Sequence, residues 1–297
     1  MNTSPRRVGV IGWPLEHSLS PIIHQYWMRE AGLPEKIYEA IPVLPDELPA
    51  FLGRLAGKGF AGCNVTVPHK EAVFSYIESH GTLDATAKHL RAVNLVSITG
   101  SGKMEGRNTD GYGFIESLRE RAPDCLPCEK AVVLGAGGAA RAILAALQSH
   151  GAQSIAVLNR TRKRAEQLIE ELKISNGEVF GKDDVRAAIK NANLLVHTTS
   201  LGMPGSPSLY EGIGVAPAEL MSGLASAAVV LDIVYTPLQT ELLQAARKQE
   251  LPAIDGLGML MHQAVPSFEA WFGVRPEVTP TLRTLLEDEL RSRGSLG

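Results

Sequence analysis

A glycine-rich turn at residues 135–140 constrains the fold of this 297-residue chain more than any other feature. The segment GAGGAA follows a continuous apolar run at 131–134 and opens an apolar helical pattern that reaches about residue 150. This order of strand, turn and helix carries the G-x-G-x-x-A form of the dinucleotide fingerprint. Gly135 permits the tight turn, Gly137 lets the backbone approach a pyrophosphate, and Ala140 allows close packing. We therefore predict a dinucleotide-binding unit. The alternative, a glycine-rich turn that serves only close packing, is disfavoured because the strand, the turn and the helix follow one another in the required order.

The residues after the next predicted strand, 154–158, indicate which dinucleotide binds. NAD-binding units of this type carry an acidic residue about 20 residues after the glycine turn, where it accepts hydrogen bonds from the ribose. Here the strand runs into Asn159-Arg160-Thr161, and further basic residues follow at 162–164. Arginine suits a 2′-phosphate and can stack on adenine. NADP is therefore favoured over NAD, with a solvated basic helix start capped by Thr161 as the alternative.

Composition narrows the class of partner. Of the residues, 44% are hydrophobic and 21% charged, and 29 Lys and Arg against 32 Asp and Glu give a net charge of −3. No global field favours nucleic acid or anionic lipid, so a small-molecule partner is expected. The apolar stretches are too interrupted to span a membrane, and the start lacks a signal-peptide pattern, which predicts a cytoplasmic protein. The three cysteines and eight histidines show no recurrent metal spacing, so we expect no metal.

Strand and helix patterns alternate along the whole chain, which predicts an α/β protein with mostly parallel sheets. Ser20 and Pro21 look like an N-cap and first helical residue. The proline-rich segment 123–129 is the best linker candidate. Strands are expected at 7–11, 38–43, 62–67, 93–99, 103–106, 131–134, 154–158, 194–197, 229–234 and 252–254, and helices at 20–31, 45–55, 70–78, 111–121, 137–150, 161–172, 258–272 and 279–290.

Polar residues gather where several of the early predicted elements begin or end. Ser18 and Ser20 lie two residues apart beside a helix N-terminus, which suits a carboxylate ligand unless Ser20 merely caps the helix. Asn64 and Thr66 share one strand face. Lys70 follows the next turn and Asp110 lies at another, so the two form a pair if their loops meet.

Taken in order, the motifs resemble the shikimate dehydrogenase family over nearly the whole chain. They are HSLSP at 17–21, GCNVTVPHK at 62–70, AVN at 92–94, NTDG at 108–111, GAGGAAR at 135–141, NRT at 159–161, TSLGMP at 199–204, DIVYTP at 232–237 and GLGMLMHQA at 256–264. The resemblance implies an N-terminal αβα catalytic domain (1–112 with 259–297), a Rossmann-type NADP-binding domain (113–258), C-terminal helices that return to the first domain, and an active site in the cleft between them. It also implies reversible reduction of 3-dehydroshikimate to shikimate by NADPH, a step of aromatic amino acid biosynthesis.

The resemblance assigns a role to each matching position. Lys70 and Asp110 would be the catalytic pair. A Lys ammonium can stabilise the oxyanion and donate a proton to it, and Asp110 can position the ammonium. Opposite charge favours the protonated lysine and desolvation opposes it. Substrate would contact Ser18, Ser20, Asn64, Thr66, Asn94, Tyr235 and Gln263, whereas NADP would contact Gly135, Ala136, Gly137, Gly138, Ala139, Asn159, Arg160, Thr161, Arg164, Ile233 and Gly256.

Three positions depart from the family pattern. Arg91 stands where glycine is usual, Leu95 where threonine is usual, and His197 where asparagine is common. Because these changes flank the predicted site, substrate specificity is less secure than the fold. The oligomeric state is also open, and a homodimer and a monomer fit the sequence equally.

Three other functions compete with this one. A quinate or dual-specificity dehydrogenase would share the scaffold and accept an extra ring hydroxyl, although the basic turn at 159–164 argues against its NAD-using forms. A regulatory relative would keep NADP binding without turnover. The presence of both Lys70 and Asp110 argues against this alternative. A thiol redox role for the C-x-x-C of Cys125 and Cys128 is disfavoured, because this spacing precedes a strand and does not open a helix.

Overall fold

The computed structural model describes residues 7–16, 18–34 and 37–294 of the chain. Its contacts divide into two compact units. The first unit comprises Met1–Asp110 and Gln263–Leu286, and the second comprises Gly111–His262 and Glu287–Gly297. Residues 123–129, expected as a linker, lie inside the second unit, where they join helix α5 (Asp110–Arg121) to strand β7 and include a short 3₁₀ turn.

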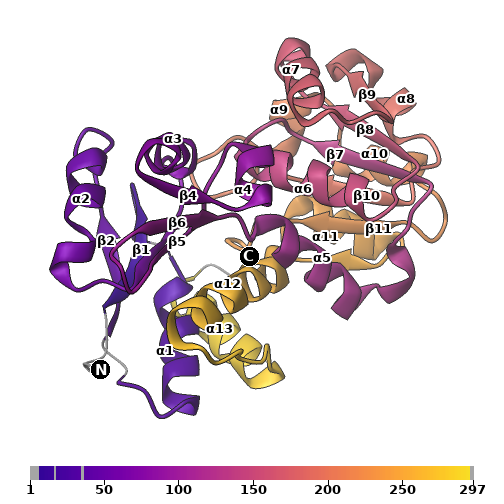
Figure 1. Cartoon of the computed structure of the whole chain (residues 1–297). Helices are drawn as coiled ribbons and strands as arrows, with labels where there is room; N and C mark the ends of the chain where they lie inside the picture. Colours follow the sequence, from indigo (N-terminus) through magenta and orange to yellow (C-terminus); the bar gives the residue numbers. More distant parts are fainter. Residues whose placement is uncertain (1–6, 17, 35–36, 295–297) are drawn as a thin grey trace. The chain divides into compact units, whose positions relative to one another are not determined.

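The first unit is built on a six-stranded mixed sheet with the order β2-β1-β3-β5-β6-β4 (Figure 1). Strand β1 is parallel to β2 and β3, whereas β5 is antiparallel to both β3 and β6. Strands β4 and β6 are also parallel, so the pairing is mostly parallel as expected, and only β5 runs against its neighbours. The short connection 99–103 joins β5 to β6 as an antiparallel pair. The bounds are β1 (Val8–Gly12), β2 (Tyr38–Pro42), β3 (Gly62–Val65), β4 (Gly81–Leu83), β5 (Leu95–Ile98) and β6 (Met104–Arg107).

Two helix groups pack on this sheet. Helices α2 (Leu48–Arg54) and α3 (Lys70–His80) join the strands in one apolar cluster that includes Leu52, Phe74 and Ile77. Helix α1 (Ser20–Glu30) packs through Trp27 on the end of α12 (Gly256–Phe272), where the rings of Trp27 and Phe268 meet edge to face. Helices α4 (Ala85–Leu90) and α13 (Pro280–Ser292) complete the set. Helix α1 is capped at Leu19, so Ser20 is its first residue and the predicted Ser20 cap is wrong.

The second unit contains a six-stranded, fully parallel sheet with the order β12-β11-β10-β7-β8-β9. Counted from β7 in chain order, this is the 3-2-1-4-5-6 arrangement of doubly wound dinucleotide-binding folds. The strand order reverses between β7 and β10, and ligands of such sheets bind beyond the carboxyl ends of the strands at that point. The bounds are β7 (Lys130–Leu134), β8 (Ser154–Leu158), β9 (Gly177–Phe180), β10 (Leu194–His197), β11 (Val229–Asp232) and β12 (Ala253–Ile254).

Helices cover both faces of this parallel sheet (Figure 1). One face carries α8 (Val185–Ile189), α9 (Leu209–Ile213), α10 (Pro217–Gly223) and α11 (Glu241–Lys248), whose apolar residues form one cluster with alternate strand residues such as Val132 and Leu134. Helices α6 (Gly138–Ser149) and α7 (Arg162–Leu172) contact β7, β8 and β9 and contribute nothing to that cluster, so they cover the opposite face.

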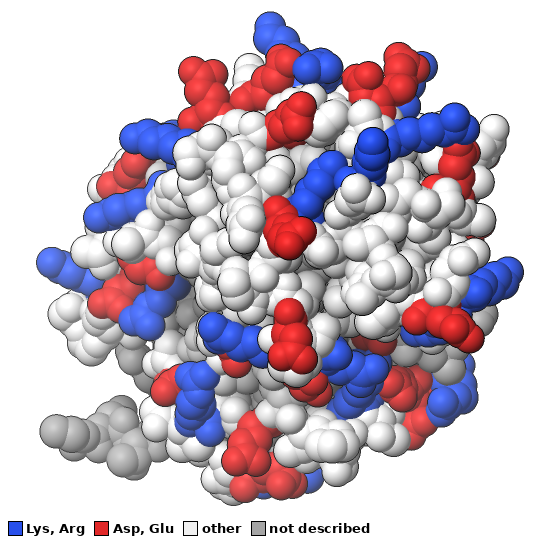
Figure 2. Space-filling model, turned by 90° about the vertical axis from the view of Figure 1, so that its right-hand side faces the viewer, with Lys and Arg blue, Asp and Glu red and all other residues white. Residues whose placement is uncertain are grey.

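The charged side chains are mixed in sign. Figure 2 shows Lys and Arg interspersed with Asp and Glu over one face of the molecule, as the near balance of charge in the sequence leads one to expect. Within the described ranges, no helix has the length and apolar character that crossing a membrane requires.

Candidate active site and cofactor site

Lys70 and Asp110 form an ion pair in the first unit. Lys70 is the first residue of α3 and Asp110 the first of α5, and Lys70 Nζ donates to Asp110 Oδ2 over 2.6 Å. Their side chains are 22% and 8% exposed, so the lysine side chain is partly accessible while that of Asp110 is enclosed. The two loops that the sequence could not bring together therefore meet, and they place a proton donor beside a fixed negative charge.

Asn94 holds the carboxylate of that pair in place. Its Nδ2 donates to Asp110 Oδ1 over 2.8 Å, while its Oδ1 accepts from the backbone N–H of Thr109 over 2.8 Å. Gln263 is drawn in from α12, since its Oε1 lies 3.4 Å from Asn94 Nδ2 and its carbonyl accepts from the Thr109 hydroxyl over 2.8 Å. One carboxamide thus fixes both the loop that carries Asp110 and one oxygen of its carboxylate.

Asn64 extends the same network toward the sheet. It is 5% exposed, and its Nδ2 donates to Ser267 Oγ over 2.7 Å and to the carbonyl of Asn94 over 3.3 Å. Its Oδ1 accepts from the hydroxyl of Tyr38 over 2.8 Å. Burial raises the pKa of Tyr38 well above its ordinary value, which keeps this hydroxyl a donor. The orientation of the Asn64 amide is therefore determined by its neighbours.

Three hydroxyls lie around the ends of β1 and β3. Ser18 Oγ accepts from the backbone N–H of Ser20 over 3.3 Å, so the alternative in which Ser20 caps the helix is wrong. Thr66 directly follows β3 and donates its N–H to the carbonyl of Ile11 over 2.9 Å, and its hydroxyl has no hydrogen-bond partner within the described ranges. The Thr66 hydroxyl is therefore available to a ligand, whereas the Ser20 hydroxyl is buried beside Tyr38. His17, which opens the same motif, lies outside the described residues.

The turn before α6 has the form that a pyrophosphate requires. Gly135 has φ +114°, and a Cβ there would lie 2.7 Å from Thr198 Oγ1 and from Thr199 Cγ2, so only glycine fits. Gly137 is the N-cap of α6 and offers no capping side chain, and a Cβ on Gly137 or Gly138 would meet nothing within 4 Å. A ligand can therefore approach the backbone of this turn, and the first N–H groups of a helix, which have no acceptor within it, favour an anion there. Ala136 and Ala139 complete this segment.

The turn after β8 suits a further phosphate. Asn159 Nδ2 donates to the carbonyl of Thr161 over 2.9 Å and stiffens the turn. Thr161 occupies the N-cap position of α7, as the alternative expects, but its side chain makes no capping hydrogen bond. Arg162 is paired with Glu166, whereas the exposed Arg160 and Arg164 have no ion-pair partner in the part of the chain that the structure describes.

The remaining predicted residues follow the last two strands, with Ile233 and Tyr235 after β11 and Gly256 after β12. Gly256 packs so closely on this segment that a Cβ there would lie 2.0 Å from the carbonyl oxygen of Ile233. Tyr235 is partly enclosed, and burial raises the pKa of its hydroxyl. Tyr235 belongs to the second unit, whereas every other predicted substrate residue belongs to the first.

Several residues of these networks escaped the sequence reasoning. Tyr38, Thr109 and Ser267 orient Asn64 and Asn94, and Asp232 pairs with His197 at the ends of β11 and β10. Thr109 lies inside the NTDG motif and Asp232 inside DIVYTP, so these motifs were the sequence signal that could have identified them. Tyr38 and Ser267 carry none, because each lies far in sequence from the asparagine it contacts.

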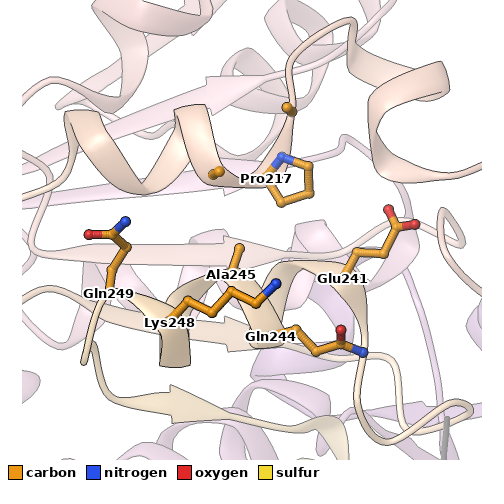
Figure 3. A pocket seen from close by; sticks show the side chains of 8 residues that line it. Pro217, Glu241, Gln244, Ala245, Lys248 and Gln249 are labelled. Carbon is orange, nitrogen blue, oxygen red and sulfur yellow. The ribbon is translucent and has the colours of Figure 1, made fainter.

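Other chemistry-bearing features are less suited to a site. Burial raises the pKa of Cys125 to about 12 and that of Cys128 to about 11, which disfavours the thiolates that a redox pair needs. A pocket of about 400 Å³ lies between the start of α10 and one side of α11. Figure 3 shows Pro217 on one side of this pocket and Gln244 and Lys248 on the other. None of the predicted site residues lines it.

Comparison with known proteins identifies the family. Models of the shikimate dehydrogenase substrate-binding domain, of shikimate/quinate 5-dehydrogenase and of the shikimate 5′-dehydrogenase C-terminal domain match residues 10–96, 117–204 and 256–286. A shikimate dehydrogenase (NADP⁺) from Methylocella silvestris is 47% identical over 292 residues, which cover 98% of this chain and 99% of the relative. This chain belongs to the shikimate dehydrogenase family.

Solved structures of this family share the fold. A shikimate dehydrogenase in complex with NADP⁺ superposes with a TM-score of 0.85 at 33% identity and covers 97% of each chain. A quinate dehydrogenase from Corynebacterium glutamicum in complex with NAD has a TM-score of 0.83 at 30% identity and covers 95% of this chain and 99% of its own. Among relatives, the same architecture thus occurs in shikimate and quinate dehydrogenases and with NADP⁺ and NAD. The fold alone therefore does not determine substrate or cofactor, and the residues of the site must do so.

Proposed function

We propose that this protein is an NADP-dependent shikimate dehydrogenase, which catalyses the reversible reduction of 3-dehydroshikimate to shikimate in aromatic amino acid biosynthesis. The observation that carries this proposal is the Lys70–Asp110 pair, 2.6 Å apart and held through Asn94, in a chain of this family. We assign substrate binding to residues 1–112 with 259–297 and cofactor binding to residues 113–258.

Reduction of a ketone to an alcohol needs a hydride and a proton. Bound NADPH supplies the hydride, and the carbonyl oxygen then needs the proton. The Lys70 ammonium stabilises the developing oxyanion and gives up one proton to it, and in the reverse direction the neutral amine takes the proton back. Asp110 holds the ammonium through Oδ2. Because Asn94 holds Oδ1, the carboxylate cannot rotate away from Lys70.

The other residues in the first unit recognise the substrate. The hydroxyls of Ser18 and Ser20 would hold the ring carboxylate, and that of Thr66 a ring hydroxyl. Asn64 and Gln263 would contact further hydroxyls, with Tyr38 and Ser267 fixing the Asn64 amide. We place Tyr235 among the substrate contacts as well. A site built to bond hydroxyls rejects analogues that lack them, because its buried polar groups would then stay unpaired.

The turns after β7 and β8 would hold NADP. The N–H groups around Gly135, Gly137 and Gly138 would receive the pyrophosphate. Arg160 and Arg164 would meet the 2′-phosphate, which NAD lacks, with Asn159 and Thr161 beside them. Ile233 and Gly256 would contact the far end of the cofactor. The exposed arginines support NADP over NAD, since no acidic residue occupies this turn to accept hydrogen bonds from a free ribose.

Initial rates of NADPH formation with shikimate and NADP test the proposal. Lys70→Ala should lower kcat by about 10²- to 10⁴-fold, which is the usual range for loss of a general acid, while NADP binding persists. Lys88→Ala, which removes an exposed lysine of α4, is the matched control and should leave the rate unchanged.

Parallel arms with quinate and with NAD separate the competing functions. Quinate oxidation with NAD that matches or exceeds shikimate oxidation with NADP would reject the assignment in favour of a quinate dehydrogenase. NADP binding without turnover on any substrate would instead identify a regulatory relative.

A further inference from the structure

His197 and Asp232 form a buried pair at the carboxyl ends of β10 and β11. The two residues are direct neighbours in the sheet register, and both side chains are 1% exposed. His197 Nδ1 lies 2.9 Å from Asp232 Oδ1. Neither residue takes part in the proposed chemistry. Burying a carboxylate costs free energy unless hydrogen-bond donors satisfy it, so the presence of this pair requires an explanation.

The hydrogen bonds around the pair tie two loops together. The N–H of Leu201 donates to Thr199 Oγ1 over 3.1 Å, and the same oxygen lies within hydrogen-bond distance of His197 Nε2 at 2.5 Å. Because a carboxylate oxygen only accepts, His197 Nδ1 carries a hydrogen and donates it to Asp232 Oδ1.

The carboxylate is satisfied from the other side as well. Asp232 Oδ1 accepts from the N–H of Val234 over 3.0 Å, and Oδ2 accepts from the hydroxyl of Thr240, the N-cap of α11, over 2.7 Å. Through His197, the segment 199–201 after β10 is therefore locked to the segment 233–235 after β11.

These two segments lie on one side of the point where the strand order reverses. The adenosine turn follows β8, on the opposite side of β7 from β10. Thr199 Cγ2 packs against Gly135, which marks the pyrophosphate position between the two sides. A dinucleotide that crosses this point with its adenosine half over β8 must extend its other half over the ends of β10 and β11.

We propose that His197 is a positioning residue for the nicotinamide half of NADP. This inference rests on the proposed cofactor. In this role, His197 touches neither substrate nor cofactor. It acts through Thr199, whose hydroxyl it fixes, and through Asp232, which fixes the N–H of Val234. Loss of either link frees the segment 199–201 and leaves the adenosine turn unaltered.

Calorimetric titration with two ligands tests this. NADP reports on the whole cofactor site, and adenosine 2′,5′-bisphosphate reports on the adenosine half alone. His197→Phe keeps a ring and removes both hydrogen bonds. Thr199→Val removes one hydroxyl from a half-buried side chain and leaves the His197–Asp232 pair intact. We expect both variants to weaken NADP binding by about 10-fold, the worth of one or two hydrogen bonds, with unchanged affinity for the bisphosphate. Thr199→Ser restores the hydroxyl and should restore NADP affinity.

Two results would overturn the inference. Equal losses for both ligands would show that the network only supports the unit, and unchanged NADP affinity in folded Thr199→Val would show that it does not position the cofactor. Thr199→Val also decides the question if His197→Phe does not fold. A parent protein that binds NADP without shikimate turnover would reject the proposed function, yet the comparison of the two ligands would still decide this inference.

Discussion

Among single residues, His24 has the most unusual surroundings. It is 0% exposed, and neither ring nitrogen has a hydrogen-bond partner among the described residues. Its ring stacks on Tyr38 at 4.1 Å, with Trp27 and Trp271 at 5.7 and 5.5 Å. Burial lowers the pKa of His24 from 6.5 to about 3. Below pH 6.5 the unfolded chain therefore binds a proton that the folded chain refuses, and folding becomes less favourable as the pH falls.

This shift predicts a measurable slope. Between pH 6.5 and about 3, His24 should lower the free energy of unfolding by up to about 1.4 kcal/mol per pH unit. His24→Phe keeps an aromatic ring and removes that contribution, so urea unfolding at pH 7, 6 and 5 should show a flatter decline than in the parent. His89→Gln replaces an exposed histidine of α4 and serves as the control. Equal slopes for the parent and His24→Phe would contradict the prediction.

Whether the sequence predicts an active-site residue depends on whether it stands in a motif or is linked only to partners far away in the chain. Lys70 and Asp110 stand in recognisable motifs, and the resemblance to a family supplied their roles. Asn64 was predicted too, but its partners Tyr38 and Ser267 were not, since Ser267 lies 203 positions away. A hydrogen bond across such a separation leaves no periodicity or spacing in the sequence, and only the folded chain reveals it.

At the scale of elements, the end of α4 explains one departure from the family pattern. Arg91 is its C-cap residue, with φ 50° and ψ 37° in the left-handed region, where glycine is favoured. Its exposed side chain lies over the ring of Phe74, with Cζ 5.3 Å from the ring centre. The loop beyond it is anchored through Val93, which donates to the carbonyl of Lys70. Arg91 therefore occupies a glycine position without entering the site.

Substitution at this position should affect stability and leave kinetics unchanged. Arg91→Gly should be more stable than Arg91→Ala by about 1 kcal/mol, because glycine adopts the left-handed conformation without a steric penalty. Neither variant should change the KM for shikimate by more than about twofold, since both lack only an exposed side chain. Urea unfolding and initial rates measure the two quantities. A larger KM change in both variants would place Arg91 in substrate selection after all.

Strongly apolar elements were predictable, whereas several weakly patterned elements were not. Strands β8 and β10 begin and end at the expected residues, and the glycine turn before α6 is confirmed. Strands β4 and β9 were missed, because they are short and carry little apolar pattern. Helix α11 was also missed, although Thr240 as N-cap and the buried pairs at 242–243 and 245–246 carry a helical signal. The parallel or mixed character of a sheet depends on connection length, which periodicity alone does not report.

At the scale of the whole molecule, the fold of one chain does not test two predictions, the functional domain limits and the oligomeric state. The functional domain limits at 112/113 and 258/259 stay a prediction. The compact units change over at nearby residues, 110/111 and 262/263, but a third change at 286/287 has no counterpart in the prediction. The homodimer also stays a prediction. Light scattering coupled to size-exclusion chromatography, with and without NADP, measures it directly, and a single species at the mass of one chain would reject it.

Hydrogen exchange with each ligand alone tests how the two functions divide over the chain. A bound ligand protects the backbone it orders and stabilises the state that binds it. NADP should slow exchange at 135–141, 159–164 and 197–201, all in the second unit, whereas shikimate should slow it at 62–70 and 92–110 in the first. The segment 216–223, beside the pocket of Figure 3, should respond to neither and serves as an internal control. Protection of 135–164 by shikimate alone would contradict the assignment, because no residue that we assign to the substrate lies there.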